Sequence, residues 1–150
     1  GYVLPPPARA GGSEESYEGG AVLEPRAGFY DECIVTLDFA SLYPSIMQRH
    51  NLCYSTLLAP GAKEPPAPGD GPSVEEAPTL GHRFAAAAVR RGLIPLVLEE
   101  LLAARAAAKR EMKSASEPQL RAVLDGRQLA LKISANSVYG FTGMSAGTLP

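Results

Sequence analysis

The sequence predicts a mixed α/β (α+β) fold, in which short β-strands precede two long helices. The β-branched run Ile34–Leu37 has strand character and ends at Asp38. Residues 93–113 are instead dense in Leu, Ala, Glu, Arg and Lys, which favour helices. A second apolar stripe recurs at helical spacing over residues 120–138. At 150 residues the chain can form one domain with a modest core.

The N-terminal half has few regular elements. Residues 1–16 are rich in Pro, Gly and Ala and are predicted to be a flexible linker or loop. Residues 21–37 favour two strands joined by a turn. A helix is expected to open behind Tyr43-Pro44 within residues 42–58, because proline is tolerated in a first turn. Residues 60–78 contain six prolines and are predicted to be a flexible surface loop.

The C-terminal half is predicted to be a helical hairpin. The first helix accepts Pro95 in its first turn, and Ser114–Pro118 interrupts the helical pattern. A second helix follows, and two helices joined by a short connection pack antiparallel. Asp125-Gly126 alone would favour a turn, and glycine costs about 1 kcal/mol relative to alanine within a helix.

The composition excludes several classes of protein. A net charge of −2 argues against a generally basic nucleic-acid coat, so any contact with DNA or nucleotides must come from local patches. Cys33 and Cys53 are too few and too far apart for a zinc site or a disulfide framework, and both are predicted to be reduced and buried. No segment has the run of about 20 apolar residues that a membrane span requires.

Asp38 is the first candidate functional residue. A strand that ends in a carboxylate, where the chain turns and exposes amide groups, suits a divalent metal with a phosphate-bearing substrate. The alternative is that Asp38 caps a helix, since Asp is favoured at that position.

A basic face on the hairpin is the second candidate. Over residues 105–132, seven basic side chains stand against three acidic ones, for a local charge of +4. The basic residues are Arg105, Lys109, Arg110, Lys113, Arg121, Arg127 and Lys132. With a turn near Glu117, Arg105 and Lys132 lie about 18 Å and about 22 Å along their axes, nearly level, and can share one anion such as a triphosphate. The alternative is an ordinary solvated helix face.

Two long motifs resemble hallmarks of the family B DNA polymerases. Asp38–Ile46 is similar to motif A of that family, and Lys132–Gly143 is similar to its motif B. Shorter matches at Tyr17–Gly20, His50–Tyr54 and Leu124–Leu131 favour the eukaryotic delta-type branch over viral and other members. The remaining alternative is a catalytically degenerate, polymerase-like scaffold.

The resemblance implies an arrangement of subdomains. Residues 17–59 would be a palm segment with motif A, and residues 60–91 a Pro/Gly-rich loop and connection. Residues 92–139 would be the fingers hairpin with motif B, and residues 140–150 would return to the palm. The chain would be an internal piece of a longer polymerase. The family's other metal-binding carboxylates would lie in a motif further along the chain, so the 150 residues alone are expected to be inactive.

The resemblance also implies roles for individual residues in adding deoxynucleotides to a primer 3′ end on a DNA template. Asp38, with the carbonyl of Phe39, would hold two Mg²⁺ ions. The nucleotide would contact Phe39, Ser41, Leu42, Tyr43, Arg105, Lys109, Lys132 and Asn136. The nascent base pair and DNA would contact Tyr139, Gly140, Tyr17, Gly19 and Gly20.

Two of these roles have alternatives. Tyr43 would be a steric gate that excludes a 2′-hydroxyl, or else a core aromatic. Tyr17–Gly20 would contact the template, or else form a glycine turn. The implied partners are primer-template DNA, deoxynucleoside triphosphates, a sliding clamp and accessory subunits, in the nucleus and without a membrane.

Overall fold

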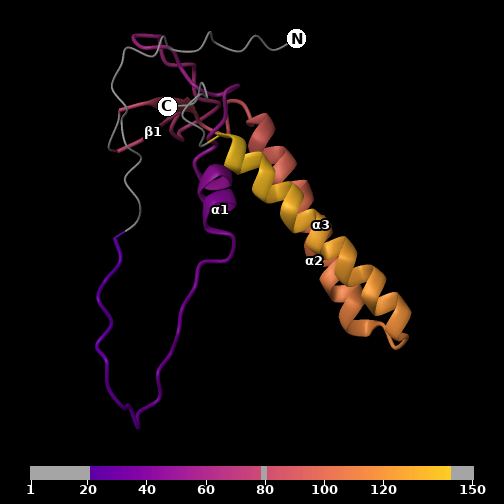
Figure 1. The fold of residues 1–150 in the computed structure, drawn as a ribbon. Helices are drawn as coiled ribbons and strands as arrows, with labels where there is room; N and C mark the ends of the chain where they lie inside the picture. The colour runs from indigo at the N-terminus through magenta and orange to yellow at the C-terminus, as the bar shows by residue number, and fades with distance from the viewer. Residues whose placement is uncertain (1–20, 79–80, 143–150) are drawn as a thin grey trace.

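The computed structural model describes residues 21–78 and 81–142, and it has a long helical hairpin attached to a smaller base (Figure 1). The elements are α1 (Leu42–Arg49), β1 (Val74–Glu76), β2 (Arg83–Ala85), α2 (Leu93–Ser114) and α3 (Pro118–Thr142). The three helices and one small sheet of these described residues confirm the predicted mixed α/β class.

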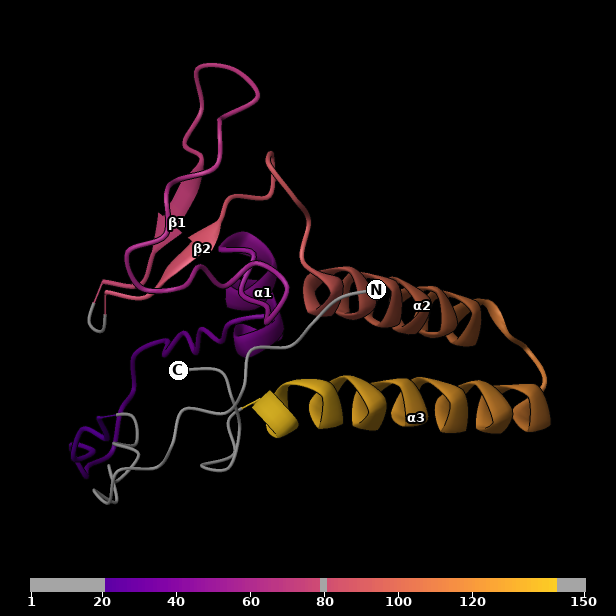
Figure 2. The same cartoon turned by 90° about the horizontal axis from the view of Figure 1, so that it is seen from above.

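The hairpin is formed by α2 and α3, which lie side by side and project away from the rest of the chain (Figures 1 and 2). The break predicted between them is confirmed, because α2 ends at Ser114 and α3 begins at Pro118. The second helix predicted over residues 120–138 is also confirmed, and the turn that Asp125-Gly126 alone would favour does not form, since both residues lie inside α3. Leu124 is buried on this helix, and such packing outweighs the helix cost of about 1 kcal/mol for one glycine.

Helix α3 also continues beyond residue 139, the expected end of the hairpin, as far as Thr142. The segment expected to return to the palm therefore begins as helix, and residues 143–150 lie outside the described part of the chain.

The base of the hairpin is held by a small apolar core. Met47 of α1, Leu98 of α2 and Ala135 of α3 are buried against one another, so all three helices meet at this point. Leu101 and Tyr139 are partly buried and pack around the same cluster. This core fixes α1 against the facing surfaces of α2 and α3.

A buried asparagine joins the segment after α1 to the start of α2. Asn51 is 2% exposed, and its Nδ2 donates to the carbonyls of Ala85, at 2.7 Å, and Arg90, at 2.8 Å. Its Oδ1 accepts from the amide of Gly92 at 2.7 Å. Gly92 has no space for a side chain, because a Cβ there would lie 2.8 Å from the Cβ of Cys53. Helix α1 was expected within residues 42–58, and it ends at Arg49. Asn51 follows in the left-handed conformation, with a φ of 54°.

The only sheet in the described residues is an antiparallel pair. Strand β1 pairs with β2 so that Val74 is opposite Ala85 and Glu76 is opposite Arg83. The prediction of a loop throughout residues 60–78 is therefore wrong at its end, where β1 lies. Strands of three residues are too short to show an alternating pattern in the sequence.

The strand predicted before Asp38 is not present. Ile34, Val35 and Leu37 are 69%, 77% and 89% exposed, and residues 21–39 contain no strand. A strand requires a neighbour for its backbone hydrogen bonds, and in the part of the chain that the structure describes no segment pairs with this one. Cys33 lies in the same segment and is exposed, which corrects the prediction that both thiols are buried, whereas Cys53 is buried as expected.

The predicted linker at residues 1–16 and the segment Tyr17–Gly20 lie outside the described residues. In the described segments, no helix combines the length and the apolar character needed to cross a membrane.

Candidate functional site

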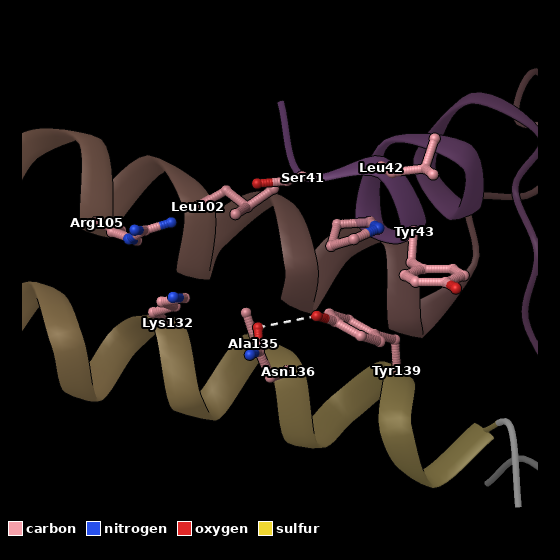
Figure 3. A pocket seen from close by; sticks show the side chains of 10 residues that line it. Ser41, Leu42, Tyr43, Leu102, Arg105, Lys132, Ala135, Asn136 and Tyr139 are labelled. Atoms are coloured by element: carbon pink, nitrogen blue, oxygen red, sulfur yellow. Dashed lines mark hydrogen bonds between the residues drawn. The ribbon is translucent and has the colours of Figure 1, made fainter. Parts of the chain in front are cut away.

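A cavity of about 250 Å³ lies where the start of α1 faces α2 and α3 (Figure 3). Its walls are formed by Ser41, Leu42, Tyr43, Pro44, Leu102, Arg105, Lys132, Ala135, Asn136 and Tyr139. Three segments that are distant in the sequence therefore contribute to one pocket. This pocket is smaller than the range of about 300–1,000 Å³ typical of ligand pockets. A ligand with more than a few functional groups would therefore extend beyond the pocket.

The first wall is the N-terminus of α1. Ser41 precedes the helix in the left-handed conformation, with φ 54° and ψ 59°, which is uncommon for a residue other than glycine. The amide of Ser45 donates to the Ser41 carbonyl at 2.9 Å, and the Ser45 Oγ donates to the Ala40 carbonyl at 2.9 Å. The first-turn amides of Leu42 and Tyr43 have no intrahelical acceptor, so this wall presents donors to an anion.

The second wall holds two cations. Arg105 projects from α2 and Lys132 from α3 into the space between the helices (Figure 3). Neither forms an ion pair with any residue of 21–78 or 81–142. Arg127, by contrast, pairs with Glu111 at 3.8 Å. Two cations side by side without a neighbouring acid favour a ligand with more than one negative charge.

The third wall is aromatic. The rings of Tyr43 and Tyr139 are stacked, with centroids 5.6 Å apart and an interplanar angle of 29°. The Tyr139 hydroxyl donates to the Asn136 Oδ1 at 2.9 Å, which leaves the Asn136 amide nitrogen as a donor (Figure 3). Flat apolar surface at one end and positive charge at the other suit a ligand with a sugar or base joined to phosphates.

The whole sequence matches one known protein family. The family model of DNA polymerase family B matches residues 1–150. The chain belongs to DNA polymerase family B.

The relatives found within family B agree with the predicted delta-type branch. The DNA polymerase delta catalytic subunit of Drosophila melanogaster is 53% identical over 153 residues, which cover 100% of this chain and 14% of that protein. The same subunit of Dictyostelium discoideum is 55% identical over 98% of this chain. The Bos taurus subunit is 53% identical over 100% of it. The chain spans only 13–14% of the length of these relatives.

A solved structure of a family B polymerase also resembles this chain. The family B DNA polymerase from the hyperthermophilic archaeon Pyrobaculum calidifontis aligns with a TM-score of 0.59 and 40% sequence identity. The alignment covers 75% of this chain and 14% of that one. The fold class and the family are therefore supported both by sequence and by structure.

Seven of the eleven predicted site residues that the structure describes come together in the pocket. Those that line it are Ser41, Leu42, Tyr43, Arg105, Lys132, Asn136 and Tyr139. Those that the structure describes elsewhere are Asp38, Phe39, Lys109 and Gly140. Tyr17, Gly19 and Gly20 lie outside the described residues.

Three pocket residues were not predicted from the sequence. Pro44, Leu102 and Ala135 line the cavity between the polar side chains. Leu102 lies three positions before Arg105 and Ala135 three positions after Lys132, so helical spacing places each on the same face as its charged neighbour. That spacing was the signal that could have identified Leu102 and Ala135, whereas Pro44 lines the cavity directly after Tyr43 in the first turn of α1.

The described residues do not form a metal site by themselves. Asp38 is exposed on the segment that leads into α1, and Phe39 beside it is 74% exposed. In the described part of the chain, no three His, Cys, Asp or Glu side chains gather closely enough to hold an ion. Asp38 can therefore contribute one carboxylate to a metal centre that needs further ligands from outside these residues.

Proposed function

We propose that this chain forms the nucleotide-binding part of a DNA-templated DNA polymerase that extends a primer in DNA replication. In this reaction the primer 3′-hydroxyl loses its proton and its oxygen bonds to the α-phosphorus of a deoxynucleoside triphosphate. The bond from that phosphorus to the oxygen bridging to the β-phosphate breaks, and pyrophosphate leaves. The observation that supports the proposal best is the pocket, which brings together the first-turn amides of α1, a tyrosine pair, and two cations that form no ion pair with any described residue.

The phosphate groups are assigned to the charged end of the pocket. Arg105 offers a planar fork of N–H donors, and Lys132 offers a compact point charge opposite it. The amides of Leu42 and Tyr43 would donate to the same phosphates from the α1 side. Asn136 would add its amide nitrogen, while its oxygen holds the Tyr139 hydroxyl. Lys109 is exposed on α2 and does not line the pocket, so we assign it a longer-range attraction for the anion.

The sugar and base are assigned to the aromatic end. Tyr43 would lie beneath the sugar, where its ring leaves no space for a 2′-hydroxyl. Tyr139 would contact the nascent base pair, and Gly140, which has open space around it, would permit close approach of DNA. Tyr17, Gly19 and Gly20 are proposed to contact DNA as well.

Magnesium is the cofactor proposed for the reaction. When bound, it would activate the nucleophile and stabilise the leaving oxygen. This chain would supply the Asp38 carboxylate and the Phe39 carbonyl, and segments beyond the described residues would supply the other ligands. The proposed partners are primer-template DNA, deoxynucleoside triphosphates, a sliding clamp and accessory polymerase subunits, with a nuclear location.

The phosphate assignment can be tested in a full-length polymerase that contains this sequence. Arg105→Ala and Lys132→Ala are each expected to lower the efficiency of nucleotide incorporation by about 100-fold. Lys113→Ala is the matched control, because Lys113 is an exposed cation on α2 that does not line the pocket. Single-turnover incorporation and primer-template affinity would be measured for each variant.

Loss of primer-template affinity with normal nucleotide use in both pocket variants would contradict the proposal. The basic face would then be a track for DNA. If all three variants behaved like the unmodified enzyme, the interpretation as an ordinary solvated helix face would hold.

A further inference from the structure

Gln128 connects the pocket cation Arg105 to an acidic side chain without placing that acid in the pocket. The Arg105 Nε donates to the Gln128 Oε1 at 3.3 Å, across the contact between α2 and α3. The Gln128 Nε2 in turn donates to the Asp125 Oδ1 at 2.9 Å, one turn earlier on α3. The three side chains therefore form one hydrogen-bonded series that starts at an exposed carboxylate and ends at the guanidinium.

The series fixes the orientation of the glutamine amide. Because the Nε2 is used by the carboxylate of Asp125, the Oε1 must face Arg105, which has donors only. With Nε occupied, the four N–H groups on the two Nη atoms of Arg105 remain for a ligand. These groups form the edge of the guanidinium that matches phosphate oxygens in a bidentate contact.

A neutral amide also preserves the charge of the arginine. A carboxylate at position 128 would form an ion pair with Arg105 and would compete with an anionic ligand for the guanidinium. Glutamine accepts one hydrogen bond and leaves the positive charge uncompensated. Gln128, Lys132 and Asn136 recur every four residues on α3, so the glutamine lies one turn from the second cation, on the same face.

We propose that Gln128 is a positioning residue, fixed by Asp125, that orients the guanidinium of Arg105 for binding the phosphates of the incoming nucleotide. This inference rests on the proposed function, because it assumes that Arg105 binds phosphate. It assigns Gln128 no contact with the nucleotide itself. Its effect on the reaction therefore passes entirely through Arg105.

The test uses a full-length polymerase that contains this sequence, with Gln128→Met as the main variant. Methionine keeps the length of the side chain and its packing between the helices, but it does not accept a strong hydrogen bond. The concentration of nucleotide needed for half-maximal single-turnover incorporation is expected to rise about tenfold. The maximal rate, the primer-template affinity and the melting temperature are expected to change little. Inhibition by inorganic tripolyphosphate, which has no base or sugar, is expected to weaken by a similar factor.

Three further variants separate positioning from general damage to the hairpin. Gln119→Met is the matched control, because Gln119 is exposed at the start of the same helix and away from the pocket. Gln128→Glu is expected to weaken nucleotide binding more than Gln128→Met, because its carboxylate neutralises Arg105. In a background of Arg105→Ala, Gln128→Met is expected to have no additional effect.

The outcomes distinguish this inference from the proposed function. If Arg105→Ala uses nucleotides normally, the phosphate assignment itself fails. If Arg105→Ala is defective while Gln128→Met equals Gln119→Met, only the positioning role is overturned. It is also overturned if the effect of Gln128→Met persists in the Arg105→Ala background, or if the loss follows the melting temperature and primer-template affinity rather than nucleotide binding.

Discussion

The ring of Tyr43 stacks on the ring of Tyr139, with the two centroids 5.6 Å apart and the planes inclined by 29°. Tyr43 belongs to the first turn of α1 and Tyr139 to the last turns of α3, so the stack joins two parts of the chain that are distant in the sequence. Tyr139 is held from its other end by the hydrogen bond to Asn136. Since Tyr43 is 55% exposed, it is not a core aromatic in the described part of the chain.

Replacement of Tyr43 by alanine is expected to raise the incorporation of ribonucleotides relative to deoxynucleotides. Pro44 restricts the backbone of Tyr43, and the stack with Tyr139 restricts its ring, so the ring can exclude an extra hydroxyl by steric overlap. Alanine leaves space for that hydroxyl. The measurement is the ratio of incorporation efficiencies for matched ribo- and deoxynucleotides in a full-length polymerase containing this sequence.

Tyr43→Phe is the control for this prediction, because it retains the ring and removes only the hydroxyl group. Its ratio is expected to stay within about threefold of the unmodified enzyme, equivalent to about 0.7 kcal/mol. An equally small change for Tyr43→Ala would remove the steric gate from the proposed function.

Asp38→Asn is expected to abolish nucleotide addition while leaving folding and primer-template binding intact. The amide has the same shape but lacks the charge that a divalent cation requires, and the loss of such a contact costs about 3 kcal/mol or more in the transition state. Asp38 is exposed, so the substitution removes no buried contact. Single-turnover rates test this, with Asp31→Asn as the control because Asp31 is exposed in the same segment. A rate above about a tenth of that of the unmodified enzyme would argue against the metal assignment.

The isolated 150-residue chain is expected to give no primer extension with magnesium and a primed template. Its described residues contain no cluster of three or more acidic or other metal-ligating side chains that could complete a site around Asp38. The assay compares the purified chain with a full-length polymerase containing the same sequence. Extension by the isolated chain would show that these residues already form a working centre.

The hairpin and the cation pair could be predicted from the sequence because both depend on local patterns. Helix formers fill α2, and the interruption at Ser114–Pro118 marks its end. Once two helices are antiparallel, the rise per residue alone places Arg105 level with Lys132. The pocket confirms that these two side chains come together.

The strand before Asp38 could not be predicted correctly because strand formation depends on a partner. Ile34–Leu37 has β-branched character, but its side chains are exposed and its backbone pairs with nothing in the described residues. The opposite error occurred at β1, where Val74–Glu76 pairs with β2 despite lying in a stretch rich in proline and glycine. In both cases a non-local pairing, rather than the local composition, decides the structure.

The role of Asn51 was missed for a related reason. The sequence shows only an asparagine after a predicted helix, with no indication that three backbone groups between Ala85 and Gly92 converge on its side chain. Contacts across 34 to 41 residues leave no periodic trace in the sequence.

Asn51→Ala is expected to destabilise the junction between α1 and α2 by about 3 kcal/mol or more, because it leaves the Ala85 carbonyl, the Arg90 carbonyl and the Gly92 amide without their partner. The left-handed backbone at Asn51, with a φ of 54°, adds about 1 kcal/mol of strain for alanine. Urea unfolding of the variant and the unmodified protein measures the loss. Asn136→Ala is the matched control, since Asn136 is exposed and loses a single exposed hydrogen bond, from Tyr139, which should cost about 1 kcal/mol or less. Equal stabilities for the two variants would mean that water or other groups form hydrogen bonds with the three backbone groups in place of Asn51. Asn51 would then not hold α2 in place.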